Sequence, residues 1–130
     1  MDNKVNADAH LKIDLVGVLE DKDHGVFAVV LSESPPESAR RIELQRSLAD
    51  DRETYCIATS WGPVQYGGVV SAALKDNILT LTFRPDAAQV LDVPSELVME
   101  LNVDADSRND LSVGLRRVFA DSEPSVRLEI

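Results

Sequence analysis

The fold of this chain is decided by one stretch, Tyr66-Gly67-Gly68-Val69-Val70-Ser71-Ala72-Ala73-Leu74-Lys75-Asp76-Asn77-Ile78-Leu79-Thr80-Leu81-Thr82-Phe83-Arg84. Two runs rich in β-forming residues flank Asp76-Asn77, and Asx residues tolerate the positive φ that a two-residue hairpin turn requires. The stretch therefore predicts a β-hairpin with Asp76-Asn77 as its loop.

The position of this loop sets the register of the hairpin. A slip of one residue would exchange its two faces, so the register is well specified. Gly67-Gly68, at the start of the first strand, predicts a β-bulge or a close approach of another backbone. The expected pairs are Leu74 with Leu79, Ala72 with Leu81 and Val70 with Phe83 on the apolar face, and Ala73 with Thr80, Ser71 with Thr82 and Val69 with Arg84 on the other.

Composition narrows the class of protein. With 130 residues, 44% of them hydrophobic, the chain is long enough for one core, and we expect a single domain over residues 1–130. The 13 Lys plus Arg against 23 Asp plus Glu give a formal charge of −10, which disfavours nucleic acid and anionic membranes and favours cationic partners. The sequence has no signal-peptide or membrane-span pattern, and its single cysteine, Cys56, fits a reducing cytoplasm.

Hydrophobic periodicity predicts the remaining elements. Pro85 to Leu91 has the pattern of a short helix with proline at its first position, and a second helix follows the capping-box spacing of Ser107 and Asp110. The stretch 42–46 fits a strand better than a short helix over 37–48. Further strands are expected within 11–19, 26–31, 54–59, 97–103 and 126–130. The predicted fold class is α+β, a mainly antiparallel sheet of about six to eight strands with about two helices packed on one face.

No metal or cofactor motif is present in the sequence. His10 and His24 lack a second ligand at metal-binding spacing, and no glycine-rich phosphate loop opens a helix. The acidic cluster of Asp104, Asp106 and Asp110 departs from the calcium-loop pattern and is better interpreted as helix capping. We therefore expect no metal and no cofactor.

Enzymatic activity would have to rest on Cys56. The thiol has apolar neighbours in a predicted strand, where an inert packed cysteine is the usual state, and a histidine base would reach it only through the fold. A small hydrolase that uses Cys56 is thus an alternative, and the sequence favours a protein that is not an enzyme.

Aromatic and acidic residues mark candidate partner contacts. Trp61 lies in a predicted turn near Tyr66, and its ring either packs over the end of the hairpin or anchors a partner. Acidic side chains in neighbouring loops would supply a negative rim to such a surface. The candidate partner-binding residues are Trp61, Tyr66, Glu33, Asp50, Asp51 and Glu53.

Several segments together resemble the immunity protein 10 family of bacterial polymorphic-toxin systems. The resemblance covers about Val26 to Ala120, and the Tyr66-Gly67-Gly68 block after the Tyr55-Cys56 strand is its most distinctive part. It implies a cytoplasmic, non-catalytic antidote that binds and blocks a cognate toxin, for which a basic nuclease would suit the charge. A small-molecule-binding or regulatory domain is the alternative and would need a concave apolar pocket. The segments are Ile42-Glu43-Leu44-Gln45-Arg46, Thr54-Tyr55-Cys56-Ile57, Gln65-Tyr66-Gly67-Gly68-Val69, Asn77-Ile78-Leu79-Thr80-Leu81-Thr82-Phe83 and Gly114-Leu115-Arg116-Arg117-Val118-Phe119.

Overall fold

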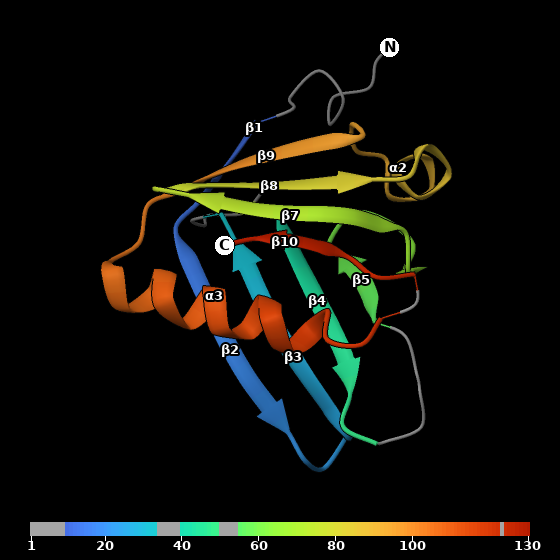
Figure 1. Ribbon diagram of the computed structural model, residues 1–130, viewed down its shortest axis with the longest axis horizontal. Helices are drawn as coiled ribbons and strands as arrows, with labels where there is room; N and C mark the ends of the chain where they lie inside the picture. The colour runs from blue at the N-terminus through green and yellow to red at the C-terminus, as the bar shows by residue number, and fades with distance from the viewer. Residues whose placement is uncertain (1–9, 34–39, 50–54, 123) are drawn as a thin grey trace.

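The strands form two five-stranded sheets that share one apolar layer (Figure 1). The computed structural model describes residues 10–33, 40–49, 55–122 and 124–130, and these residues contain ten strands and two helices. Most strand pairs are antiparallel, so the predicted α+β class is confirmed, with slightly more strands than expected. The strands of one sheet run across Figure 1 and those of the other run steeply down it.

Sheet A contains the β-hairpin with Asp76-Asn77 as its loop, and it contains both ends of the described chain. Its order is β1-β9-β8-β7-β10, and the two outer strands, β1 and β10, pair in parallel with their neighbours. The strands are β1 (His10–Ile13), β7 (Val69–Lys75), β8 (Ile78–Phe83), β9 (Glu96–Leu101) and β10 (Arg127–Glu129).

Sheet B is an antiparallel meander of consecutive strands, in the order β2-β3-β4-β5-β6. The predicted strand at 42–46 is confirmed as β4. Helix α3 (Ala105–Val118) packs against one side of β3, its inner side. The strands are β2 (Leu15–Asp21), β3 (Val26–Ser32), β4 (Arg41–Ser47), β5 (Cys56–Thr59) and β6 (Gln65–Tyr66).

Asp14 is the point at which the chain leaves sheet A for sheet B. The sequence predicted one strand through this region, but the structure breaks it between β1 and β2. The Asp14 N–H donates to the Ser32 carbonyl at 2.9 Å, and Asn102 Nδ2 donates to Asp14 Oδ1 at 2.9 Å. These bonds attach the corner to β3 and to the end of β9, so both sheets hold it in place.

The hairpin register is confirmed near the turn and differs near its open end. Leu74–Leu79, Ala72–Leu81, Ala73–Thr80 and Ser71–Thr82 pair as predicted, and Asp76 has a φ of 54° in the loop. The predicted pairs Val70–Phe83 and Val69–Arg84 are wrong, because a bulge between Val69 and Ser71 places Val69 opposite Phe83. Val70 is consequently 41% exposed.

Gly68, just before this bulge, occupies a position where both the backbone conformation and the available space favour glycine. Its φ is 98°, and a Cβ there would lie 2.5 Å from the Cβ of Ala87 in helix α2 (Pro85–Leu91). Gly67 also has a positive φ, of 70°, but a Cβ there would meet nothing within 4 Å. The close contact at Gly68 is thus with a side-chain atom of α2 and not with another backbone, and the predicted bulge lies just after the two glycines, between Val69 and Ser71.

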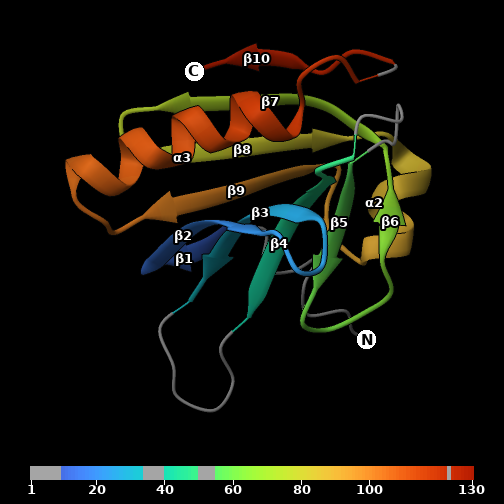
Figure 2. The ribbon, with the colours of Figure 1, turned by 90° about the horizontal axis from the view of Figure 1, so that it is seen from below.

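Helix α3 (Ala105–Val118) packs on the inner face of sheet B (Figure 2). Its buried stripe includes Leu111, Leu115 and Val118, as predicted. The predicted capping residues were three positions too late, because the carboxylate of Asp104 accepts the Ser107 N–H at 2.8 Å and is the N-cap.

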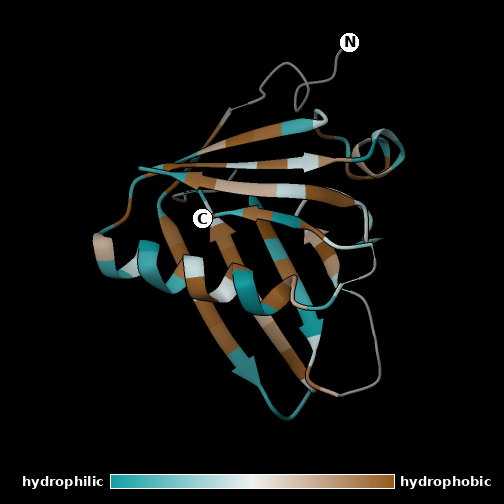
Figure 3. Cartoon of the chain, viewed as in Figure 1, coloured by the Kyte–Doolittle hydropathy of each residue, from teal (hydrophilic) through white to brown (hydrophobic). Residues whose placement is uncertain are grey.

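The core lies between the inner faces of the two sheets and α3. Figure 3 shows the hydrophobic residues gathered on the strands, and β2 is hydrophobic along most of its length. Arg46 points inward from β4 and donates through Nη1 to the Val118 and Ala120 carbonyls, both at 2.6 Å, so the end of α3 is fastened to sheet B. The largest fully buried side chains are Leu11, Ile13, Leu31, Ile42, Leu44, Ile57, Leu79, Leu81, Leu91, Leu97, Met99 and Leu111.

Candidate functional site

The outer face of sheet B, the side turned away from the core, is the candidate functional site. The ladder pairs Leu19 with Ala28, Ala28 with Gln45, Gln45 with Cys56 and Cys56 with Tyr66. Because directly paired residues share one face of a sheet, these side chains form a single row across the sheet. We call this set the outer row. The next row holds Gly17, Val30, Glu43 and Ala58.

The two ends of the outer row carry large exposed side chains. Tyr66 is 67% exposed at one end and Leu19 is 47% exposed at the other, with Leu15 on the same strand face 58% exposed. Cys56 and Gln45 between them are half-buried. Leu15 and Leu19 thus form an exposed apolar pair on β2, and Tyr66 is a separate exposed ring at the other edge of the sheet.

Polar groups on this face bind one another. Arg41 Nε donates to Glu43 Oε2 at 3.2 Å, and Gln45 Nε2 donates to Glu43 Oε1 at 2.8 Å. The Cys56 thiol in turn lies 3.7 Å from Gln45 Oε1, as a weak donor. The charge of Glu43 is thus compensated within the face, and the middle of the face is close to neutral.

Cys56 and His24 line the same shallow hollow, of about 250 Å³, beside Tyr66. The thiol contacts Gln45, whereas His24 Nδ1 lies 2.8 Å from Asp21 Oδ2. Burial, followed by the nearby charge of Glu43, raises the pKa of the Cys56 thiol, which is the opposite of what an activated nucleophile requires. The side chain of His10, the other histidine, lies outside the described part of the structure. This geometry gives the hydrolase alternative no support.

Trp61 lies in the connection between β5 and β6, and its side chain reaches helix α2. Its indole Nε1 donates to the Leu91 carbonyl at 2.9 Å, and its half-buried ring packs against the core. The ring therefore joins this connection to α2 at the end of the helix, and a part of it remains accessible.

Among the predicted acidic contacts, Glu33 lies within the described residues. Glu33 forms a two-pronged ion pair with Arg40, at 3.0 Å from Nε to Oε1 and 2.8 Å from Nη2 to Oε2. The hydrogen bonds from Arg40 hold the pKa of Glu33 below its ordinary value. Asp50, Asp51 and Glu53 lie outside the described residues.

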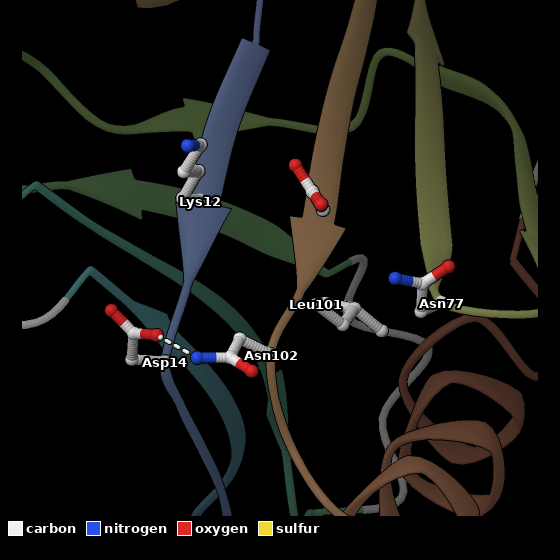
Figure 4. Close-up of a pocket in the computed structure, with 6 residues that line it drawn as sticks. Lys12, Asp14, Asn77, Leu101 and Asn102 are labelled. Atoms are coloured by element: carbon white, nitrogen blue, oxygen red, sulfur yellow. Dashed lines mark hydrogen bonds between the residues drawn. The ribbon is translucent and has the colours of Figure 1, made fainter.

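A second hollow opens at the corner between the sheets (Figure 4). Its lining includes Lys12, Asp14, Asn77, Glu100 and Asn102, and Leu101 is its apolar member. Charged and amide groups dominate this lining, whereas a site for an apolar small molecule is mostly hydrophobic. Within the described residues, no group of three or more His, Cys, Asp or Glu side chains is placed to hold a metal ion.

Comparison with known protein families gives one decisive match. A family model described as Immunity protein 10 matches residues 12–109 of the 130-residue chain. The chain belongs to the immunity protein 10 family. No curated protein and no solved structure gives a significant match. Neither described helix has the length and apolarity that a membrane-spanning helix needs.

The part of the chain that matches the immunity protein 10 family includes all of sheet B. It also includes the turn with Trp61, and it ends within α3. The sequence singled out Tyr66 on this face but missed Leu15 and Leu19. The available signal was that β2 is apolar on both of its faces, which is unusual for a strand that ends a sheet.

Proposed function

We propose that this protein is a non-catalytic immunity protein that binds its cognate bacterial toxin directly and blocks it. The match to the immunity protein 10 family over residues 12–109 carries this proposal. A face with exposed Tyr66 and Leu19 supports binding to another protein, because aromatic and aliphatic side chains dominate the energetic centres of interfaces. The raised pKa of Cys56 supports a role without covalent catalysis.

The direct test uses the toxin encoded by the gene next to that of this protein. Co-expression with this toxin should restore bacterial growth, and the purified proteins should form a complex. An active-site variant of the toxin should bind equally well, because the proposed mechanism is occlusion. Failure of the two wild-type proteins to bind would remove the proposed function.

The formal charge of −10 indicates a basic partner, such as a nuclease with a cationic substrate channel. We propose that Asp50, Asp51 and Glu53 help to steer this toxin towards the protein. Replacing them with Asn, Asn and Gln should lower the association rate by on the order of tenfold at low salt. Raising the salt above about 0.1 M should have a similar effect on the wild-type protein, while the dissociation rate changes less.

A matched control separates local steering from total charge. The exposed residues Asp76, Glu96 and Asp110 can be neutralised together, which changes the net charge by the same amount at other places. Stopped-flow association at two salt concentrations should show a smaller loss for this control. Equal losses would assign the steering to the net charge alone, and a salt-independent association rate would discard electrostatic steering.

Trp61 and Glu33 are also proposed as partner contacts, through the parts of their side chains that remain accessible. For Trp61→Ala we expect mainly a faster dissociation. Because the Trp61 ring also bonds to Leu91, thermal unfolding of the same variant must be compared with its binding. A dissociation rate equal to or lower than that of the wild-type protein, in a Trp61→Ala variant with unchanged thermal stability, would remove Trp61 from the interface.

A further inference from the structure

We infer that the outer face of sheet B is the surface that docks the toxin, with Leu15 and Leu19 at one end of the face and Tyr66 at the other as its exposed apolar contacts. This inference rests on the proposed function and adds the location of the contact. The occupant is a toxin surface that presents apolar side chains opposite the two ends of this face and basic side chains around them.

The register of the strands provides the first argument. Direct cross-strand pairing places Leu19, Cys56 and Tyr66 in one row, although they come from strands far apart in the sequence. A row built from backbone hydrogen bonds is rigid, so little conformational entropy is lost when a partner binds it. The face is therefore a preorganised platform with large side chains at both ends of the row.

The second argument is the distribution of charge on this face. Glu43 is engaged by Arg41 and by Gln45, and the surrounding positions Val30 and Ala58 are uncharged. Centres of protein interfaces are depleted of charged residues, and their rims are polar. At the rim, Asp21 accepts hydrogen bonds from His24, which lower the pKa of Asp21 and keep its carboxylate ionised.

The size of the face argues for a partner that reaches over this rim. With strands roughly 4.8 Å apart and a rise of about 3.3 Å per residue, the sheet offers a projected area of about 400 Å². A typical stable complex buries about 800 Å² on each partner. A toxin that covers the whole face therefore extends past its borders, and the charged turn residues Asp21, Lys22 and Asp23 lie at one of these borders, at the end of β2.

Charge complementarity selects the toxin over a second copy of this chain. Two copies would each bring a formal charge of −10 to the interface, and long-range repulsion would oppose their association. A basic toxin gains from the same charge. The exposed apolar residues at the two ends of the face and the negative charge of the molecule are thus complementary to a basic protein partner.

The first experiment measures the dissociation constant of the complex with the neighbouring toxin for Tyr66→Ala and Leu19→Ala. We expect an increase of about 30-fold for Tyr66→Ala, as for an interface hot spot, and a smaller but clear increase for Leu19→Ala. Val113→Ala is the matched control, because Val113 is 59% exposed on α3 and faces away from this surface's strands. Its dissociation constant should stay within twofold of the wild-type value.

The outcomes separate this inference from the proposed function. Wild-type binding that survives both Tyr66→Ala and Leu19→Ala unchanged would overturn the docking face and leave the proposed function intact. A concentration-dependent dimer of the free protein that Tyr66→Ala abolishes in sedimentation would assign the face to a second copy. A large drop in melting temperature without a change in toxin affinity would show that the face is covered within its own chain.

Cys56 provides a second measurement that needs no substitution. It is the sole cysteine of the chain and a half-buried member of the outer row. Saturating toxin should slow its alkylation by iodoacetamide about tenfold, measured by mass spectrometry of the Cys56 peptide, because docking limits access. Hen egg-white lysozyme, another basic protein, should leave the rate unchanged. An unprotected Cys56 in the saturated complex would contradict the inference.

Discussion

The outer faces of the two sheets differ in chemistry although the sheets have the same number of strands and share one core. On sheet A the outward pairs include Thr82 with Glu96 and Thr80 with Ala73 and Val98, a mixed face on which no large hydrophobic residue of β8 or β9 is exposed. On sheet B the outward row ends in exposed Leu19 and Tyr66.

This difference indicates that the outer face of sheet B is shaped by a requirement other than solubility. The inner faces of β8 and β9 in sheet A are fully buried, whereas Val18 of sheet B stays 38% exposed beside α3. Packing of these inner faces does not require apolar residues on the outside of either sheet. Sheet A satisfies solubility with threonine and glutamate, whereas sheet B exposes an apolar strand at its edge, which is normally an aggregation hazard. A partner that covers sheet B accounts for the difference, and the following predictions test it.

Gly68→Ala should produce the largest effect, because Gly68 lies where the chain crosses from sheet B to sheet A. The new Cβ would lie 2.5 Å from Ala87 Cβ, and the φ of 98° strains any L-residue. Together these effects should destabilise the protein by on the order of 3 kcal/mol in urea unfolding. Gly67→Ala is the control, since it has the strain without the clash and should lose roughly 1 kcal/mol. Equal losses for the two variants would contradict the role given to α2.

Gly114→Ala should disturb sheet B alone. A Cβ there would lie 2.8 Å from Cγ2 of Val29, a fully buried residue of the inner face. We expect a net loss of about 2 kcal/mol, although alanine favours a helix more than glycine does. Adding Val29→Ala should recover part of the loss in a double-mutant cycle. A stabilised single variant would show that α3 can shift freely on the sheet.

Cys56→Ala should cost about 1 kcal/mol or less in stability, because it removes one half-buried sulfur. Toxin neutralisation should persist in a growth assay, since the proposed contact needs the shape of the face and not the thiol. Thr80→Ala on sheet A provides the comparison and should leave toxin affinity unchanged. Complete loss of protection by well-folded Cys56→Ala would revive the enzyme alternative.

The smallest effect is expected from the ion pair of Glu33 with Arg40 next to β3. The folded-state pKa of Glu33 is lower than its ordinary value of 4.5, so the unfolded state binds more protons at acidic pH. The stabilisation is complete above about pH 4.5 and is lost as the pH falls through the folded-state pKa. Glu33→Gln should reduce this acid-dependent loss by less than about 1 kcal/mol in urea unfolding between about pH 6 and pH 3. An identical pH profile in both proteins would exclude a contribution of the pair.

Much of the candidate site could not be predicted from the sequence. Tyr66 was singled out as an aromatic residue near a turn, but its neighbours on the face, Leu19 and Cys56, are brought to it by strand pairings that no local pattern encodes. Trp61 was correctly placed in a turn, whereas its hydrogen bond to the Leu91 carbonyl depends on where α2 docks.

The sequence by itself determined the local elements. Asp76-Asn77 set the hairpin and four of its cross-strand pairs, Pro85 began α2 at its first position, and the stripe from Leu111 to Val118 identified the buried side of α3. Such features follow from turn chemistry and periodicity, which act over a few residues. Only the tertiary structure decided the break at Asp14, the bulge that turns Val70 outward, and the division into two sheets. These depend on contacts between residues far apart in the chain, such as the bond between Asp14 and Asn102, 88 positions away, whose free energy exists only once both sheets have formed.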